Sequence, residues 1–289
     1  MTQNNSKISL KEKLGSVSSL FTVIGALIVL IVFFSITSPY FFNARNFLNI
    51  GLYAAIVGCI SCSVTFVNIA GMMDISVGSQ IAVVGMAVAV ASRSGMTWPL
   101  VVIVGLFTGV LCGAFNGFLI TVIKLNAFIT TIATMQTLRG IAYLISAGQS
   151  LPISDNAVRF IGRGYVLGIP LSLLIMIISY IVFHLISKYT VFGRQVYMIG
   201  GNPQASFLAG IKVNFMRFRI YLLNGFMAGV SGILLSAQTG SGMPNAAATY
   251  NMTASVSYTH LLRVPLRPGM AAQKPSCLAR ASLKMWLMP

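Results

Sequence analysis

Residues 192–211 read FGRQVYMIGGNPQASFLAGI, a polar stretch between the two apolar runs Val166–Ile186 and Phe218–Ala237. Each run is long enough to cross a bilayer, since a spanning helix needs about 20 apolar residues. The polar stretch must therefore emerge on one face of a membrane. Its position between two spans would let another protein act on both spans through it.

The same stretch carries helix signals of its own. Asn202 is a good N-cap, Pro203 suits the first helical position, and Gly210 suits the position just past the end. We therefore expect a short capped helix over Pro203–Gly210.

The composition predicts an all-α, polytopic membrane protein. Of 289 residues, 56% are hydrophobic and 8% are charged, and the mean hydropathy is +0.87, whereas soluble domains carry about 25% charged residues. Lys and Arg number 19 against 3 acids, which gives a net charge of +16. These cations lie mostly in short loops between apolar runs. We interpret them as orientation signals and contacts with membrane lipid, and expect no nucleic-acid partner.

About seven spans follow from the apolar runs. The seven predicted spans are Ser18–Thr37, Phe47–Ala70, Gln80–Ala91 with a possible extension back through Val77, Trp98–Ile123, Ala127–Ala147, Val166–Ser187 and Phe218–Thr239.

The distribution of cations predicts the orientation. With the N-terminus inside, 9 Lys and Arg fall in inner segments and 4 in outer ones, when the tail and Arg139 are left out. This bias favours a cytoplasmic N-terminal segment (1–17) and a cytoplasmic loop at 188–217. The inner cations are Lys7, Lys11, Lys13, Lys124, Lys188, Arg194, Lys212, Arg217 and Arg219, and the outer ones are Arg45, Arg93, Arg159 and Arg163.

Glycines recur in two spans at helical spacing. In the fourth span they stand every four residues from Gly105 to Gly117, and in the seventh Gly225 and Gly229 repeat the pattern. Small residues at this spacing let another helix backbone approach closely. The plain interpretation is tight helix packing, and the sharper one is a face that slides during transport.

The segment Gly71–Ser79 (GMMDISVGS) joins two apolar runs with almost no loop between them. Its glycines, Gly71 and Gly78, permit a break in the helix, which is tolerated at membrane depth only inside protein or beside a water-filled cavity. In one interpretation Asp74 or Ser76 caps a helix near the interface. In the other, Asp74 is a functional carboxylate in a transport path. Arg139, inside the fifth span, is a possible partner for an acid or a polar cavity residue, and no acid is obviously paired with it.

Catalytic and metal-binding patterns are missing from the sequence. Cys59 and Cys62 form a Cys-x-x-Cys pair inside an apolar run without a second pair of ligands, which favours packing over metal or redox chemistry. His184 lies within a span, where a packed histidine is the better interpretation. No phosphate-binding loop of the Gly-x-x-x-x-Gly-Lys-Ser/Thr type occurs, so this chain does not itself bind ATP through one. With these patterns missing, we expect no enzyme activity, metal or cofactor on this chain.

Four segments in order resemble the permease subunits of ribose-, xylose- and galactose-type sugar ABC importers. Three are Gly71–Ser79, Leu125–Gly140 (LNAFITTIATMQTLRG) and the stretch from Phe192 to Ile211, and the fourth is Ser241–Asn245 (SGMPN). The resemblance covers roughly residues 20–250.

The resemblance implies a transmembrane subunit that moves a monosaccharide or related small polar solute across a bacterial inner membrane. It also implies that the family fold has more spans than the seven predicted here. It further implies cytoplasmic ATPase subunits, an extracytoplasmic solute-binding protein and a second permease copy. The helix from Pro203 to Gly210 would be the coupling helix that docks on the ATPase. The residues carried over to this coupling loop are Gly200, Gly201, Asn202, Pro203, Gln204, Ala205, Leu208 and Gly210.

Two departures from the family pattern stand out. Where the family commonly has Glu-Glu-Ala-Ala, this chain has Pro203-Gln204-Ala205-Ser206, so the acidic charge is missing. After the permease domain (18–250), the segment 251–289 is rich in proline and basic residues and has no run that could span a membrane. We interpret this tail as foreign to the fold, the result of truncation or a frameshift. The alternative is a natural disordered tail.

Two further functions stay open at this stage. The chain could be a secondary carrier that uses Asp74 for protons, or a membrane scaffold without transport. The transported solute does not follow from the sequence.

Overall fold

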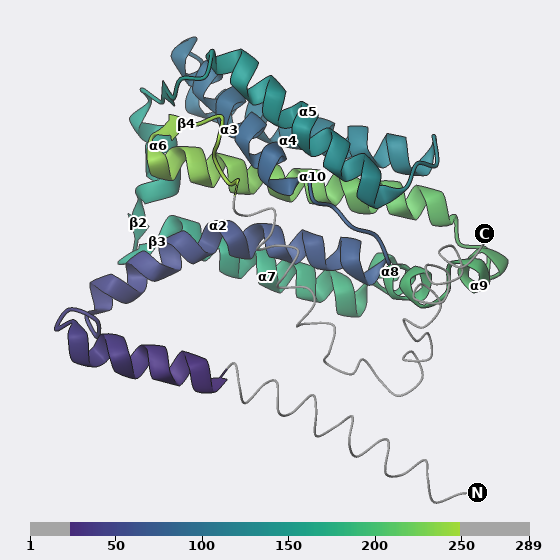
Figure 1. The fold of residues 1–289 in the computed structure, drawn as a ribbon, viewed down its shortest axis with the longest axis horizontal. Coiled ribbons are helices and arrows are strands. Elements are labelled where there is room, and N and C mark those ends of the chain that lie inside the picture. Colours follow the sequence, from purple (N-terminus) through teal and green to yellow (C-terminus); the bar gives the residue numbers. More distant parts are fainter. Residues whose placement is uncertain (1–23, 249–289) are drawn as a thin grey trace, which may run out of the picture. The chain divides into compact units, whose positions relative to one another are not determined.

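The computed structural model describes residues 24–248 (Figure 1). The chain divides into two compact units, and the described part of the first is an apolar helix that runs to the unit boundary, Ile24–Thr37. This helix matches the later part of the first predicted span, whose residues 18–23 lie outside the described residues. The segments 1–17 and 251–289 also lie outside them.

Six long helices make up most of the described part of the second unit, residues 37–248. They are α2 (Ala44–Ile69), α3 (Val77–Arg93), α4 (Trp98–Thr121), α5 (Ala127–Ser146), α7 (Leu171–Tyr189) and α10 (Val213–Thr239).

Short elements join the long helices. They are the helices α6 (Asn156–Arg163), α8 (Val191–Gly201) and α9 (Pro203–Leu208) and four two-residue strands, β1 (Leu151–Pro152), β2 (Tyr165–Val166), β3 (Ile169–Pro170) and β4 (Ser241–Gly242). β1 pairs with β4 and β2 with β3, both antiparallel.

The helical membrane fold predicted from the sequence is confirmed. Among the described helices, α2, α4, α7 and α10 are long and apolar enough to cross a membrane. α3 is shorter, at 17 residues, and α5 contains Arg139, but both follow the predicted spans. α3 begins at Val77, as the extended prediction allowed.

Two predicted span starts lie five residues from the observed ones. The sixth span begins at Leu171 instead of Val166, because Tyr165–Pro170 forms the β2–β3 hairpin. The seventh begins five residues before Phe218, at Val213, because a helix can start in the polar edge of a span when tertiary contacts support it. Met216 at that edge is buried against the core.

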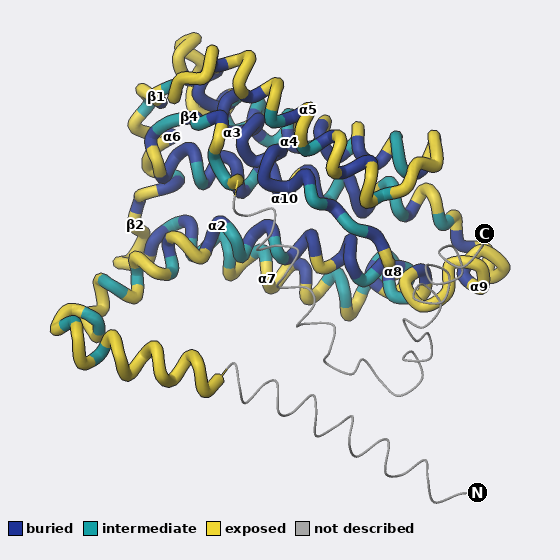
Figure 2. Tube along the Cα trace, in the orientation of Figure 1, coloured by how far each residue is buried: buried dark blue, intermediate teal, exposed yellow. Residues whose placement is uncertain are grey.

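α10 lies at the centre of this unit and packs against α2, α3 and α4 (Figure 1). The burial pattern agrees, since α3 and α10 are buried along most of their length, whereas the outward faces of α4, α5 and α7 are exposed (Figure 2). These outward faces carry large apolar side chains such as Phe107, Leu144 and Ile178. Exposed apolar faces of this kind are what a helix presents to lipid.

The two glycine stripes pack against each other. A Cβ built at Gly109 would lie 2.7 Å from the Gly229 Cα, and one at Gly113 would lie 2.8 Å from the Gly225 Cα. Real Cβ atoms essentially never approach so closely, so only glycine permits this contact of α4 with α10. Tight helix packing, the plain interpretation of the stripes, is therefore what the structure contains.

The helix directions place the described cations at two ends. α2, α4 and α7 run toward α8 and α9, and α10 starts there, so the predicted inner cations Lys124, Lys188 and Lys212 gather at that end (Figure 1). The predicted outer cations Arg93 and Arg159 lie at the end that holds α6. The structure thus separates the two described sets as the sequence predicted.

Candidate functional site

A break in the helical backbone separates α2 from α3. α2 closes with hydrogen bonds from Ala70 N–H to Phe66 O (3.1 Å) and from Met72 N–H to Val67 O (3.0 Å). Gly71, at φ +74°, turns the chain out of the helix, in a conformation that costs glycine little. The chain then runs without regular structure to α3. The break predicted for this segment is confirmed.

Asp74 lies buried in this break, with 7% of its surface exposed. One carboxylate oxygen accepts from Ser76 N–H (2.9 Å) and Ser76 Oγ (2.6 Å). The other accepts from Gln80 Nε2 (3.2 Å) on α3 and Asn224 Nδ2 (2.8 Å) on α10. The carboxylate therefore meets four neutral donors, and hydrogen bonds to a charged acceptor are among the stronger ones in proteins.

A second layer holds these donors in place. Asn116 Nδ2 on α4 donates to Ser76 Oγ (2.7 Å), and Ser63 Oγ on α2 donates to Asn224 Oδ1 (2.8 Å). Tyr221 Oη on α10 donates to the backbone oxygen of Met73 (2.9 Å). The segment 70–76 is thereby tied to four long helices. We call Ser63, Asp74, Ser76, Gln80, Asn116 and Asn224 the buried polar cluster.

The buried polar cluster lies inside the bundle and away from the helix ends. Asn224 stands 11 residues after the start of α10, which is about 16 Å along the helix. Broken backbone at such depth is received here by protein, as membrane proteins require. Two cluster oxygens, Gln80 Oε1 and Asn116 Oδ1, are buried without a protein hydrogen-bond partner.

The predicted residues of this segment take distinct roles. Asp74 bonds the Ser76 N–H at the start of α3, whereas Ser76, the N-cap residue, makes no side-chain cap bond. Ser76 instead joins Asp74 to Asn116 through its hydroxyl. Gly78 lies buried in the first turn of α3. Asp74 thus bonds the start of α3 deep in the bundle, whereas the capping interpretation expected this bond near an interface.

Arg139 lies apart from Asp74. Its Nη1 donates to the backbone oxygens of Pro244 and Ala246, both at 2.8 Å. These residues follow β4, so Arg139 fastens the chain after α10 to α5. Its Nη2 is buried without a hydrogen-bond partner. The described partners of Arg139 are thus backbone oxygens and not an acid.

The predicted coupling stretch is almost wholly helical. Gly200 and Gly201 end α8, and Asn202 joins α8 to α9. The Asn202 side chain accepts from Gln204 N–H and Ala205 N–H, both at 3.0 Å, so the predicted N-cap is confirmed. Pro203 occupies the first turn, as predicted.

α9 ends earlier than expected. It stops at Leu208, two residues before the predicted end. Gly210, at φ +84°, turns the chain away, and Ile211 N–H returns to Ser206 O (3.0 Å). The range Pro203–Gly210 was therefore too long at its end, whereas Gly210 stands just past the helix end, as predicted.

α9 presents apolar side chains outward. Phe207 is 70% exposed and Leu208 is 86% exposed, while Ser206 is the buried residue of the helix. Gln204 and Ala205 are exposed as well. We call Gln204, Ala205, Phe207 and Leu208 the α9 surface. It lies at the end of the unit where the inner cations gather, and the preceding helix α8 contacts the C-terminal end of α2 (Figure 1).

Several residues of the site were not anticipated. Asn116, Asn224 and Gln80 were read as parts of apolar runs, and Phe207 was not named in the coupling loop. The signal for the amides was present, because an uncharged amide inside a spanning run usually hydrogen-bonds within the protein. The partner of each amide could not be read from the sequence, since the partners come from other helices.

The fold and the site define a multi-pass helical membrane protein with a buried polar cluster at its centre and a short exposed helix at one end. The chain belongs to the family described as "Branched-chain amino acid transport system / permease component", whose model matches residues 46–259. It is thus a permease component of a transport system and not itself an enzyme.

Curated relatives carry sugar-transport names. The chain is 38% identical to the ribose import permease protein RbsC of Haemophilus influenzae, over 79% of this chain and 72% of the relative. It is 35% identical to the L-arabinose transport system permease protein AraH of Escherichia coli, over 79% and 70%. It is 27% identical to the xylose transport system permease protein XylH of the same organism, over 78% and 74%.

No solved structure matches the chain significantly. The family match supports the ABC permease interpretation and does not favour the proton-coupled carrier that uses Asp74.

Proposed function

We propose that this chain is the membrane subunit of an ATP-driven importer for a monosaccharide or a related small polar solute. The relatives support the solute class, because their names include ribose, L-arabinose and xylose transport. The family description supports the role of permease component. In this proposal ATP is hydrolysed on separate cytoplasmic ATPase subunits, and an extracytoplasmic binding protein delivers the solute.

The observation that carries the proposal is the α9 surface. Phe207 and Leu208 project from a helix whose ends are fixed by Asn202 and Gly210. A short, rigid helix with exposed apolar side chains fits an apolar groove on a partner protein. The family's acidic residues are absent here, so this docking rests on apolar contact through Ala205, Phe207 and Leu208.

The orientation and the assembly complete the proposal. The Lys and Arg bias supports a bacterial inner-membrane protein whose N-terminus and whose end with α8 and α9 face the cytoplasm. A second copy of the chain forms the other half of the pathway, as the resemblance implies. The exposed apolar faces of α4, α5 and α7 contact membrane lipid and this second copy.

Replacement of Leu208 by Asp tests the docking role. Burying a leucine side chain contributes about 1.5–3 kcal/mol, and a buried unpaired carboxylate adds a further penalty. We therefore expect Leu208→Asp to lower capture of the ATPase subunit by about tenfold or more. ATP-dependent uptake of ribose, arabinose or xylose into vesicles with the binding protein should fall in parallel.

Val191→Asp is the matched control. Val191 is also apolar, 59% exposed and at the same end of the unit, but it begins α8 and lies outside the α9 surface. An acid in the first turn of a helix is tolerated, so this variant should bind the ATPase normally. Equal ATPase capture by Leu208→Asp and the original chain would contradict the coupling role.

A further inference from the structure

Gly200 makes a close backbone contact with the end of α2. A Cβ built at Gly200 would overlap the carbonyl oxygen of Ile69 and lie 2.9 Å from the carbonyl carbon. Ile69 is the last residue of α2. The crowding atoms belong to the backbone, so no side-chain rotation could relieve them. Only glycine can occupy position 200 while α8 keeps this position against α2.

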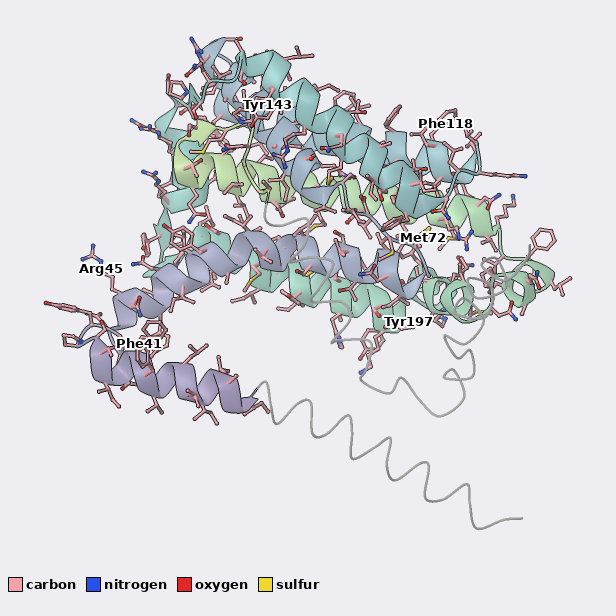
Figure 3. The ribbon with its side chains drawn as sticks, in the orientation of Figure 1. Phe41, Arg45, Met72, Phe118, Tyr143 and Tyr197 are labelled. Atoms are coloured by element: carbon pink, nitrogen blue, oxygen red, sulfur yellow. The ribbon has the colours of Figure 1, made fainter. Side chains whose placement is uncertain are left out.

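The α8 side of the contact forms one body with α9. Val196 and Ile199 are fully buried and pack in the same core as Ala70 and Met72. Asn202 N–H donates to Met198 O (3.1 Å), which closes α8, and the Asn202 side chain starts α9. No flexible linker therefore separates Gly200 from the α9 surface. Met72 and Tyr197 mark this region in Figure 3.

The α2 side of the contact leads directly to the buried polar cluster. Ile69 precedes the break by one residue, and Asp74 follows five residues later. Met73 is bonded by Tyr221, and Asp74 by Asn224, so α10 holds the segment from the far side. A displacement of Ile69 must be taken up within residues 70–76 or passed to α3 and α10.

We propose that Gly200 is a positioning residue that transmits movement of the α9 surface to residues 70–76 through its contact with Ile69. The proposal rests on the proposed function, because it takes the ATPase as the source of the movement. Its new content is the route. The route enters the membrane part of the protein at the end of α2 and reaches the buried polar cluster within a few residues.

Gly200→Ala tests this route in the assembled complex with its ATPase and binding protein. The added methyl would push α8 away from Ile69. ATP hydrolysis should then continue, but the movement would no longer reach residues 70–76. We expect the number of ATP molecules hydrolysed per solute imported to rise about tenfold, since ångström-scale misplacement costs that much or more in positioned reactions. ATPase capture should stay unchanged, because the α9 surface is intact.

Two glycine-to-alanine controls separate this effect from general damage. Gly140→Ala adds a methyl on α5 where nothing lies within 4 Å. Gly162→Ala crowds the backbone of Ala237 and Gln238, at the end opposite to α9. Neither should change the ATP cost per solute. An equal rise for Gly162→Ala would overturn the proposal, because crowding alone would then explain the effect.

Hydrogen exchange in the unaltered complex provides a second test that needs no variant. Trapping the ATPase in its closed state with ATP and vanadate should change the protection of residues 70–76 together with residues 196–210. A change confined to 196–210 would overturn the proposal, and so would a Gly200→Ala complex with the original ATP cost.

The two proposals fail in different ways. If the unaltered complex shows no ATP-dependent import, the proposed function fails. If it imports normally and Gly200→Ala imports at the same ATP cost, the route through Gly200 fails and the function stands.

Discussion

Replacing Asp74 by Asn should destabilise the fold markedly, although the two side chains have nearly the same shape. Asn keeps one oxygen, which can remain on the Ser76 N–H and hydroxyl. Its amide nitrogen would then face two donors, Gln80 Nε2 at 3.2 Å and Asn224 Nδ2 at 2.8 Å from the oxygen that it replaces. Two hydrogen bonds to a charged acceptor are lost, and each contributes about 1.5–3 kcal/mol.

Two effects reduce this expected loss in the free energy of unfolding. Gln80 can turn its unpartnered Oε1 toward the new amide, although it then gives up its 2.8 Å bond to Ser76 Oγ. Removing a buried charge also removes part of its desolvation cost. We expect a net loss of about 2–4 kcal/mol in the free energy of unfolding.

The assay uses the buried thiols Cys59, Cys62 and Cys112. They become reactive to a thiol-specific dye as the described unit unfolds, so labelling of the detergent-solubilised protein during heating reports its melting temperature. Asp155→Asn is the matched control. Asp155 caps α6 through a 2.8 Å bond from Ala157 N–H, and Asn is an equally good N-cap. An Asp74→Asn protein that melts together with the Asp155→Asn protein would refute this account of the buried polar cluster.

Two further predictions concern the packing of α4 against α10 and the hydrogen bonds of Arg139. Gly113→Ala places a methyl group 2.8 Å from the Gly225 Cα, so we expect a loss of about 1–3 kcal/mol in the free energy of unfolding, followed by the same thermal assay. Gly140→Ala should be neutral or slightly stabilising, and equal melting temperatures of the two variants would contradict this packing. Arg139→Met removes two 2.8 Å hydrogen bonds to backbone oxygens after β4, so hydrogen exchange in residues 243–248 should become about tenfold faster. Unchanged exchange there would show that Arg139 does not hold this segment.

The helical elements were largely predictable because each rests on local signals. Apolar runs gave the positions of the spans, and Asn202 with Pro203 gave the start of α9. The helix α8 was missed because Gly193, Gly200 and Gly201 read as loop residues. The contacts of Gly193 with Ser187 and of Gly200 with Ile69 explain why glycine is used within a helix at these two positions. Intrinsic propensity gives way to such contacts.

The buried polar cluster was only partly predictable for a different reason. Asp74 was conspicuous as a lone acid, and Gly71 marked the break. Asn116, the partner of Ser76, and Asn224, the partner of Asp74, stand 40 and 150 residues away from them in the sequence. No local pattern connects residues over such distances. Arg139 shows the same limit, since its partners are backbone oxygens, which the sequence does not mark.

The glycine contact between α4 and α10 has a mechanical consequence. The backbones of α4 and α10 meet here without a flexible side chain between them, so the two helices form a rigid frame. Asn116 from one member and Asn224 from the other anchor the segment that holds Asp74 to this frame. Motion in a transport cycle then falls to more yielding contacts. One of these is the contact of α2 with α7, where the flexible thioether of Met176 lies against Gly58.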